Sequence, residues 1–206
     1  MNAKNTRFNQ LLLVLMVVLY ALSLFAFSYA NWKVDSEHIL WMYLLNALIL
    51  SIPLVLFFGG LYVLISAWRE YSTDGQISQQ RAKIIHWAPR VAAILIIFFV
   101  SLFSLDVFEM EATPIEMLGG FLIHNVPSIV MIVLLVLAWR KPVIGFIAFL
   151  LVGIFFLRFV ILGRDLAHFL LFSGPMLLVA ALFYADWRWL KPGPADQLEG
   201  ASSSSG

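Results

Sequence analysis

The sequence predicts an all-α fold, a polytopic membrane bundle of six transmembrane helices. Three observations support this prediction. Hydrophobic residues make up 62% of the chain and charged residues only 12%. Six apolar stretches are long enough to cross a bilayer, and Lys and Arg gather in alternate connections. Because an ordinary soluble domain is about half apolar and about a quarter charged, the composition favours lipid as the surroundings of this chain.

Each predicted span contains about 20 mostly apolar residues, the length that a helix needs to cross a hydrocarbon core about 30 Å thick. The second span is long enough to tilt or to bend at Pro53. Connections are short except for residues 70–89, a polar stretch that we expect to be the main soluble loop. We place the transmembrane domain at residues 1–192, with spans at about 11–30, 39–67, 91–108, 118–139, 143–162 and 166–189.

Both ends of the chain need a separate interpretation. Lys4 and Arg7 precede the first span, and Ser28-Tyr29-Ala30 places small residues where a signal peptidase cleaves. The apolar part is longer than the roughly 7–15 residues of a signal peptide, so we expect an uncleaved anchor, whereas cleavage would leave five spans. Residues 195–206 contain a serine run and are typical of a flexible linker or tag remnant.

The basic residues predict the orientation in the membrane. With a cytoplasmic N-terminus, ten of them lie on the cytoplasmic side and three lie outside. Short cytoplasmic connections of membrane proteins are enriched in Lys and Arg, so we expect both termini in the cytoplasm. The ten are Lys4, Arg7, Arg69, Arg81, Lys83, Arg90, Arg140, Lys141, Arg188 and Lys191, and the three are Lys33, Arg158 and Arg164.

A weak internal repeat suggests that the bundle is built from repeated helical hairpins. Spans four and six share a Pro-x11-Trp-Arg pattern that starts at Pro127 and at Pro175. The second span also ends in Trp68-Arg69, and Pro89 and Pro142 precede the third and fifth spans. The alternative is that any span can close with an interfacial tryptophan and a cytoplasmic arginine.

Ionisable residues inside a span are costly in lipid and therefore mark candidate functional sites. At about 1.5 Å per residue, three of them lie at one depth, roughly 22–24 Å from the cytoplasmic ends of their spans. Three hypotheses remain open for this outer cluster: an interhelical clamp, a ligand or metal site, and proton chemistry between a carboxylate and an imidazole. The three residues are Asp106, His124 and Arg158, and Asn125, Asp165 and His168 complete the cluster.

We expect no cofactor, although the sequence leaves a metal open. The chain has no cysteine, which excludes disulfides, Cys-ligated zinc and iron–sulfur clusters. His38, His124 and His168 lie at the outer ends of the even-numbered spans, where Zn²⁺ or Cu²⁺ binding is possible, but no compact motif supports it and ordinary interfacial histidines are the favoured interpretation. Haem b would need His124 and His168 to face each other, yet their depths differ by about 6 Å.

Three stretches of the sequence resemble the pattern of a known family. They are Ser104-Leu105-Asp106-Val107-Phe108, the stretch Gly-Phe-Leu-Ile-His-Asn-Val-Pro at residues 120–127, and Ala138-Trp139. The pattern is similar to that of small prokaryotic multi-pass membrane proteins without an assigned function, and the likeness covers the third to fifth spans. It implies that Asp106 and His124 belong to a family pattern, and a prokaryotic inner membrane is the expected location. It implies no activity.

Three classes of function are consistent with the sequence. The first is an accessory or scaffold protein that binds a membrane-protein partner, a second copy or lipid, and this class needs no chemistry. The second is a small transporter or channel, for which only Asn46, Ser51 and Ser101 supply polar groups near the middle of the bilayer. The third is a metal-binding, haem-binding or enzymatic protein that uses the outer cluster. Because the basic residues are dispersed and the net charge is +1, we expect no nucleic-acid partner.

Overall fold

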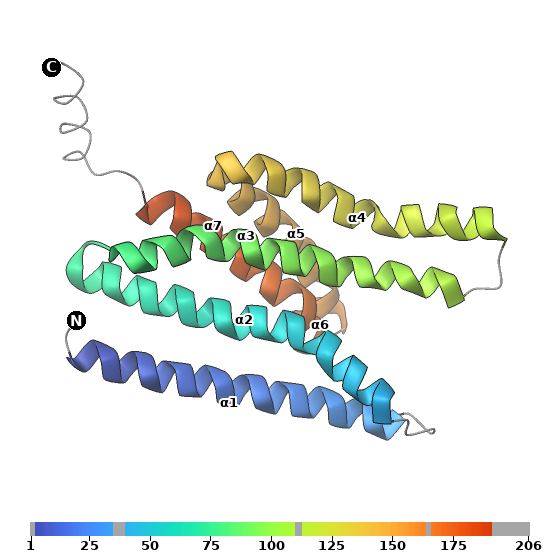
Figure 1. Cartoon of the computed structure of the whole chain (residues 1–206), viewed down its shortest axis with the longest axis horizontal. Helices are drawn as coiled ribbons and strands as arrows, with labels where there is room; N and C mark the ends of the chain where they lie inside the picture. Colours follow the sequence, from blue (N-terminus) through green and yellow to red (C-terminus); the bar gives the residue numbers. More distant parts are fainter. Residues whose placement is uncertain (1–2, 35–39, 110–112, 164–165, 191–206) are drawn as a thin grey trace, which may run out of the picture.

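The computed structural model describes residues 3–34, 40–109, 113–163 and 166–190, and within them the predicted all-α fold is confirmed (Figure 1). Two irregular helical segments interrupt the α-helices: a 3-10 helix, η1, and a π-helix, η2. The elements in chain order are α1 (Ala3–Val34), α2 (Leu40–Asp74), α3 (Gln79–Leu102), η1 (Phe103–Glu109), α4 (Pro114–Arg140), α5 (Pro142–Gly163), α6 (Leu166–His168), η2 (Phe169–Ser173) and α7 (Gly174–Trp189).

In the described part of the chain, six helical runs are long and apolar enough to cross a membrane, as in a multi-pass membrane protein. The predicted spans match these runs closely. Residue 39 and the predicted linker at 195–206 lie outside the described residues. The end of the third predicted span differs, because residues 103–108 form η1 instead of an α-helix. The sixth span combines α6, η2 and α7.

The prediction of a soluble loop at residues 70–89 is wrong. α2 continues to Asp74 and α3 already begins at Gln79, so residues 75–78 alone connect them. Gly75 ends α2 with a φ of 68°, a left-handed conformation that favours glycine, and its N–H donates to the carbonyl of Tyr71 at 3.0 Å. Pro89 lies inside α3 instead of preceding it. The polar residues therefore belong to two helices that extend beyond their apolar segments.

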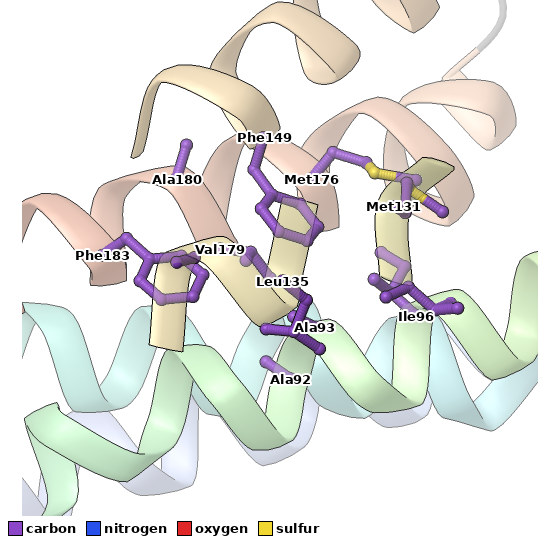
Figure 2. Close-up of a cluster of buried hydrophobic side chains, with 12 residues drawn as sticks. Ala92, Ala93, Ile96, Met131, Leu135, Phe149, Met176, Val179, Ala180 and Phe183 are labelled. Carbon is purple, nitrogen blue, oxygen red and sulfur yellow. The ribbon is translucent and has the colours of Figure 1, made fainter. Parts of the chain in front are cut away.

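The main core lies where α3, α4 and α5 meet α7 (Figure 2). Close helix contact at glycine is part of this packing. A Cβ atom on Gly145 of α5 would lie 2.7 Å from the ring of Phe183, and one on Gly153 would lie 2.7 Å from the side chain of Leu177. Small residues at such contacts are typical of helix association in lipid. The core is formed by Ala92, Ala93, Ile96, Ile97, Met131, Leu135, Ala138, Phe149, Met176, Val179, Ala180 and Phe183.

α1 runs beside α2 (Figure 1) and shares with it a second, smaller cluster of buried side chains. Leu12 and Met16 of α1 meet Leu54 and Phe58 of α2 there. Most of the other large apolar side chains of α1 are exposed. This distribution is expected of a helix that packs on one neighbour and faces lipid elsewhere.

A π-helical turn interrupts the sixth span just before Pro175. Proline has no N–H to donate, and local π geometry is one way in which a membrane helix accommodates it. The Oγ of the buried Ser173 donates to the carbonyl of Gly153 at 3.0 Å and ties this turn to α5. In contrast, Pro127 lies in the interior of α4. The two prolines of the predicted repeat thus have different local surroundings, and the hairpin repeat stays a prediction.

Candidate functional site

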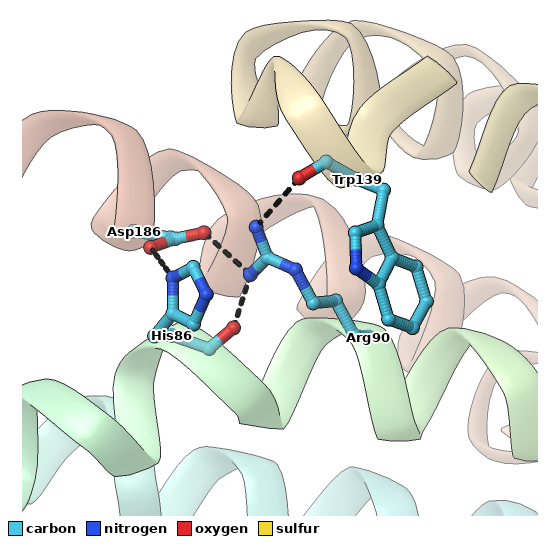
Figure 3. Close-up of polar contacts among 4 residues, drawn as sticks. All are labelled: His86, Arg90, Trp139 and Asp186. Carbon is cyan, nitrogen blue, oxygen red and sulfur yellow. Dashed lines mark hydrogen bonds and ion pairs between the residues drawn. The ribbon is translucent and has the colours of Figure 1, made fainter. Parts of the chain in front are cut away.

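A buried cluster of charged residues connects α3 to α7 and α4 (Figure 3). His86 and Arg90 belong to α3, Asp186 belongs to α7, and Trp139 lies at the end of α4. The four-residue spacing of His86 and Arg90 places both on one face of α3, because a helix makes one turn in 3.6 residues. That face is turned toward the last two turns of α7.

The centre of the cluster is an ion pair between Arg90 and Asp186. Nη1 of Arg90 donates to Oδ2 of Asp186 at 2.7 Å, and the two side chains are only 2% and 3% exposed. A charge can be buried in this way only when an opposite charge and hydrogen bonds compensate for the lost solvent. Removing either partner would leave an uncompensated charge inside the bundle.

Further contacts of the guanidinium extend the cluster to α4. Nη1 of Arg90 also donates to the carbonyl of His86, and Nη2 donates to the carbonyl of Trp139 at 3.3 Å. The guanidinium carbon lies 6.0 Å from the ring centres of Trp139 and Phe183, at the outer limit of a cation–π contact. Nε has no hydrogen-bond partner in the described part of the chain. One arginine therefore links three helices.

His86 connects the buried pair with the surface of the bundle. Its Nδ1–H donates to Oδ1 of Asp186 at 3.1 Å, while its side chain is 50% exposed. Each oxygen of the carboxylate consequently has its own partner, Arg90 or His86. Two roles are chemically open to this arrangement: it can fix the positions of three helices, and its imidazole can pass a proton between the surface and the carboxylate.

The residues of the predicted outer cluster lie on separate elements. His124 and Asn125 bond within α4, since Nδ1–H of His124 donates to the Gly120 carbonyl at 2.9 Å and Nδ2 of Asn125 donates to the Phe121 carbonyl at 3.0 Å. Arg158 is exposed on α5, and His168 stacks on Phe172. Asp106 lies in η1, with its side chain outside the described part, and Asp165 lies outside the described residues. The outer cluster stays a prediction.

A metal site was also left open by the sequence. Among the described residues, no group of three or more His, Asp or Glu side chains is placed to hold a metal ion. His38 lies outside the described residues. Binding of zinc, copper or haem therefore stays an untested hypothesis.

Sequence reasoning missed His86 and Asp186 and assigned Arg90 to a cytoplasmic connection. A usable signal was present, because Asp186 is the one acidic residue between Leu166 and Trp189. An acidic residue within an apolar span requires a partner, and Arg90 borders the predicted third span. Placing a helix boundary at Pro89 concealed the pair, since α3 continues through that proline.

The second half of the chain matches a family described as a domain of unknown function, DUF7670, over residues 78–195. No curated protein and no solved structure matches the chain. The matched residues include α3 to α7, and with them every residue of the charged cluster, whereas α1 and α2 precede the match. The prediction of an uncharacterised family is confirmed, and this match covers more than half of the chain. The chain thus belongs to the DUF7670 family, whose function is unknown.

Proposed function

We propose that this chain is an accessory membrane protein that holds a transmembrane helix of a partner protein in a groove between α3 and α4. The groove has a volume of about 540 Å³. Its lining is apolar except for Ser101 of α3 and Asn125 and Ser128 of α4. Ile94, Phe98 and Leu122 are exposed along it, so the groove is open at the side of the bundle.

The hydroxyl of Ser128 is the observation that carries the proposal. Ser128 is 2% exposed, and its Oγ has no hydrogen-bond partner in the described part of the chain. The other two polar residues of the groove have partners, because Ser101 donates to the Phe98 carbonyl and Asn125 to the Phe121 carbonyl. An unpaired polar group in the hydrocarbon region is costly, since no water is present to bond it.

A partner helix suits this groove better than a lipid chain. An acyl chain offers no hydrogen-bonding group to Ser128. A transmembrane helix that carries Ser, Thr, Asn or Gln among small residues can approach closely, displace the side chains that cover Ser128 and pair with the hydroxyl.

The variant Ser128→Ala tests the proposal through two effects of opposite sign. In the isolated protein the change removes a buried unpaired hydroxyl, so we expect an unchanged or slightly higher unfolding temperature in detergent. In native membranes the same change is expected to weaken the partner complex. A photo-crosslinking amino acid at Phe98 reports that complex, and the same group at Val14, on the exposed face of α1, is the control.

The crosslinked peptide decides the outcome. The proposal predicts that Phe98 captures an apolar span of another protein, that this span contains Ser, Thr, Asn or Gln, and that Ser128→Ala reduces the yield. Equal capture from Phe98 and Val14 would contradict the proposal. Capture of lipid alone, or of a peptide from a second copy of this chain, would also contradict it.

We also infer that both termini face the cytoplasm of a prokaryotic cell. In support, the start of α1, the turn between α2 and α3, the connection between α4 and α5 and the end of α7 lie at one end of the bundle (Figure 1). Most of the basic residues belong to these segments, as the positive-inside rule requires. A fluorescent protein fused after Trp189 should fluoresce and a periplasmic phosphatase fused there should be inactive, and the reverse result would contradict the inference.

Small transporters form the second candidate class, and one observation favours it. Asp186 is a buried carboxylate that is bonded to a half-exposed imidazole, and such groups in membrane helices often serve proton transfer. Liposomes that contain the purified protein and a pH-sensitive dye test this class. Proton flux that disappears in Asp186→Asn would favour transport over the accessory role.

A further inference from the structure

A second, more polar pocket lies between α2 and α3, at the end of the bundle where the two helices are joined. Its volume is about 230 Å³. Tyr62 and Ser66 line it from α2, and Ser78, Gln80 and Arg81 line it from the beginning of α3. The Arg81 side chain is the charged group of this lining, and the pocket is separate from both the charged cluster and the α3–α4 groove.

Within the described part of the chain, the Arg81 guanidinium is paired on one edge only. Its Nε donates to Oε2 of Glu70 at 2.6 Å, and the two side chains are 21% and 18% exposed. The other oxygen of Glu70 accepts the N–H of Ser78 at 2.9 Å, so the carboxylate is fixed and in turn orients the guanidinium. Nη1 of Arg81 is buried and has no partner among the described residues.

A buried donor of a guanidinium without an acceptor indicates a missing acceptor, because leaving such a group unpaired is costly. Arginine binds phosphate oxygens especially well through its fixed set of N–H donors. The hydroxyls of Tyr62 and Ser78 and the amide of Gln80 add neutral donors to the same pocket. Since Glu70 already offsets the charge of Arg81, a singly charged phosphodiester suits the pocket better than a doubly charged phosphate monoester.

The position of the pocket agrees with a phosphate group of a lipid. α2 and α3 are joined at this level, and the adjacent Trp68 is 60% exposed. Tryptophan is enriched at the boundary between hydrocarbon and headgroups. Ile84 and Ile85, which follow Gln80 and Arg81 by one turn of α3, also line the pocket and offer an apolar contact for the glycerol or chain region.

We propose that the pocket between α2 and α3 binds a phosphodiester, the phosphate group of a phospholipid headgroup, through the edge of the Arg81 guanidinium that Glu70 does not occupy. Inorganic phosphate shares part of this chemistry and is the other possible source. The proposal does not depend on a partner helix in the α3–α4 groove, because the two sites use different faces of α3.

Native mass spectrometry of delipidated protein in detergent, titrated with a phospholipid, tests the proposal. Arg81→Gln should weaken phospholipid binding about tenfold, the loss of one hydrogen bond to a charged group. Lys83→Gln is the matched control, since it removes the same charge from an exposed side chain two residues along α3 that does not line the pocket, and it should retain the affinity of the wild type. A diacylglycerol with the same chains lacks the phosphate and should bind weakly to both variants and to the wild type.

The remaining outcomes each decide for or against the proposal. Equal losses in the Arg81 and Lys83 variants, or diacylglycerol binding as strong as phospholipid binding, would overturn it. If inorganic phosphate displaces the lipid from the wild type but not from Arg81→Gln, the result supports phosphate recognition by Arg81 and shows that the free ion is also a ligand. Should Arg81→Gln fail to fold, Ser66→Leu decides, because it fills the pocket and leaves Arg81 intact: unchanged binding in that variant would overturn the proposal.

Discussion

The first two helices of this bundle and the pair α3 and α7 are packed in different ways. In the most apolar part of the first span 11% of residues are buried, and in the second 17%, against 44% for the third and 50% for the sixth. α3 and α7 share the Arg90–Asp186 pair, whereas α1 meets α2 mainly through apolar side chains. The family match covers α3 to α7 and excludes α1 and α2.

This difference shows what holds a helical bundle together in lipid. Apolar side chains are as well solvated by acyl chains as by one another, so the burial of apolar area alone gives little driving force for helix association. Close packing and polar pairing therefore determine how strongly the helices associate. Both features occur within α3 to α7, and α2 shares in them through its Glu70–Arg81 ion pair and the close approach of Gly60 to Leu178, whereas α1 meets α2 mainly through apolar side chains. We therefore expect the largest losses of stability from substitutions that break a polar pair, smaller losses from those that disturb a close helix contact, and the smallest from those that only remove apolar area.

The largest effect is expected from Asp186→Ala, because it leaves the Arg90 guanidinium buried without its counter-charge. Breaking one partner of a buried ion pair costs about 3–5 kcal/mol. The free energy of unfolding, measured by denaturant titration in mixed micelles, checks this value. A loss no larger than that of an α1 variant would contradict the ranking.

The second largest effect is expected from Gly145→Ala. Its Cβ would lie 2.7 Å from the ring of Phe183, so α5 and α7 must separate, at a cost of about 1–3 kcal/mol. Gly119→Ala is the matched control, because nothing lies within 4 Å of a Cβ there. The thermal unfolding midpoint should fall in the first variant and stay or rise in the second, and equal shifts would contradict the close contact.

A smaller effect is expected from His86→Ala, which removes one hydrogen bond to Asp186 from a half-exposed side chain. The loss should be about 0.5–1.5 kcal/mol. His124→Ala is the comparison, since that side chain is exposed and bonds only within its own helix among the described residues. Should the predicted outer cluster act as the main clamp instead, unfolding measurements on the two variants would show the reverse order.

The smallest effect in this series is expected from Leu12→Ala in α1, at about 1 kcal/mol or less. Leu12 is buried mainly against α2. Leu182→Ala in α7 removes the same atoms from a site enclosed more completely and should cost more. A larger loss for Leu12 in the same unfolding assay would show that α1 is as integral to the bundle as α7.

The spans were predictable because lipid imposes two simple conditions. Every backbone hydrogen bond of a spanning segment must be made within its helix, and the bilayer fixes the length of the apolar run. Helix ends do not follow these conditions. α2 and α3 continue past their apolar segments until Gly75 reverses the chain, so the hydropathy pattern marks the edge of the lipid and not the end of the helix.

The charged cluster was harder to predict, because it depends on which helix faces meet. Arg90 and Asp186 are 96 residues apart in the chain, and no local pattern joins them. Counting residues along a span gives the depth of a residue in the membrane but not the side of the helix on which it lies. The choice of Asp106, His124 and Arg158 depended on depth alone. His124 and Arg158 are both exposed in the folded chain, a feature of helix rotation that residue counting does not reveal.

A double-mutant cycle on Arg90 and Asp186 tests most directly whether their ion pair is the structural tie of the α3–α7 bundle. Arg90→Met and Asp186→Leu each leave one buried charge without its partner, while the double variant leaves none. We predict a loss of unfolding free energy of about 3–5 kcal/mol in each single variant, recovery of most of it in the double variant, and therefore a coupling energy at least as large as either single loss. Losses that add to within about 0.5 kcal/mol would contradict this account.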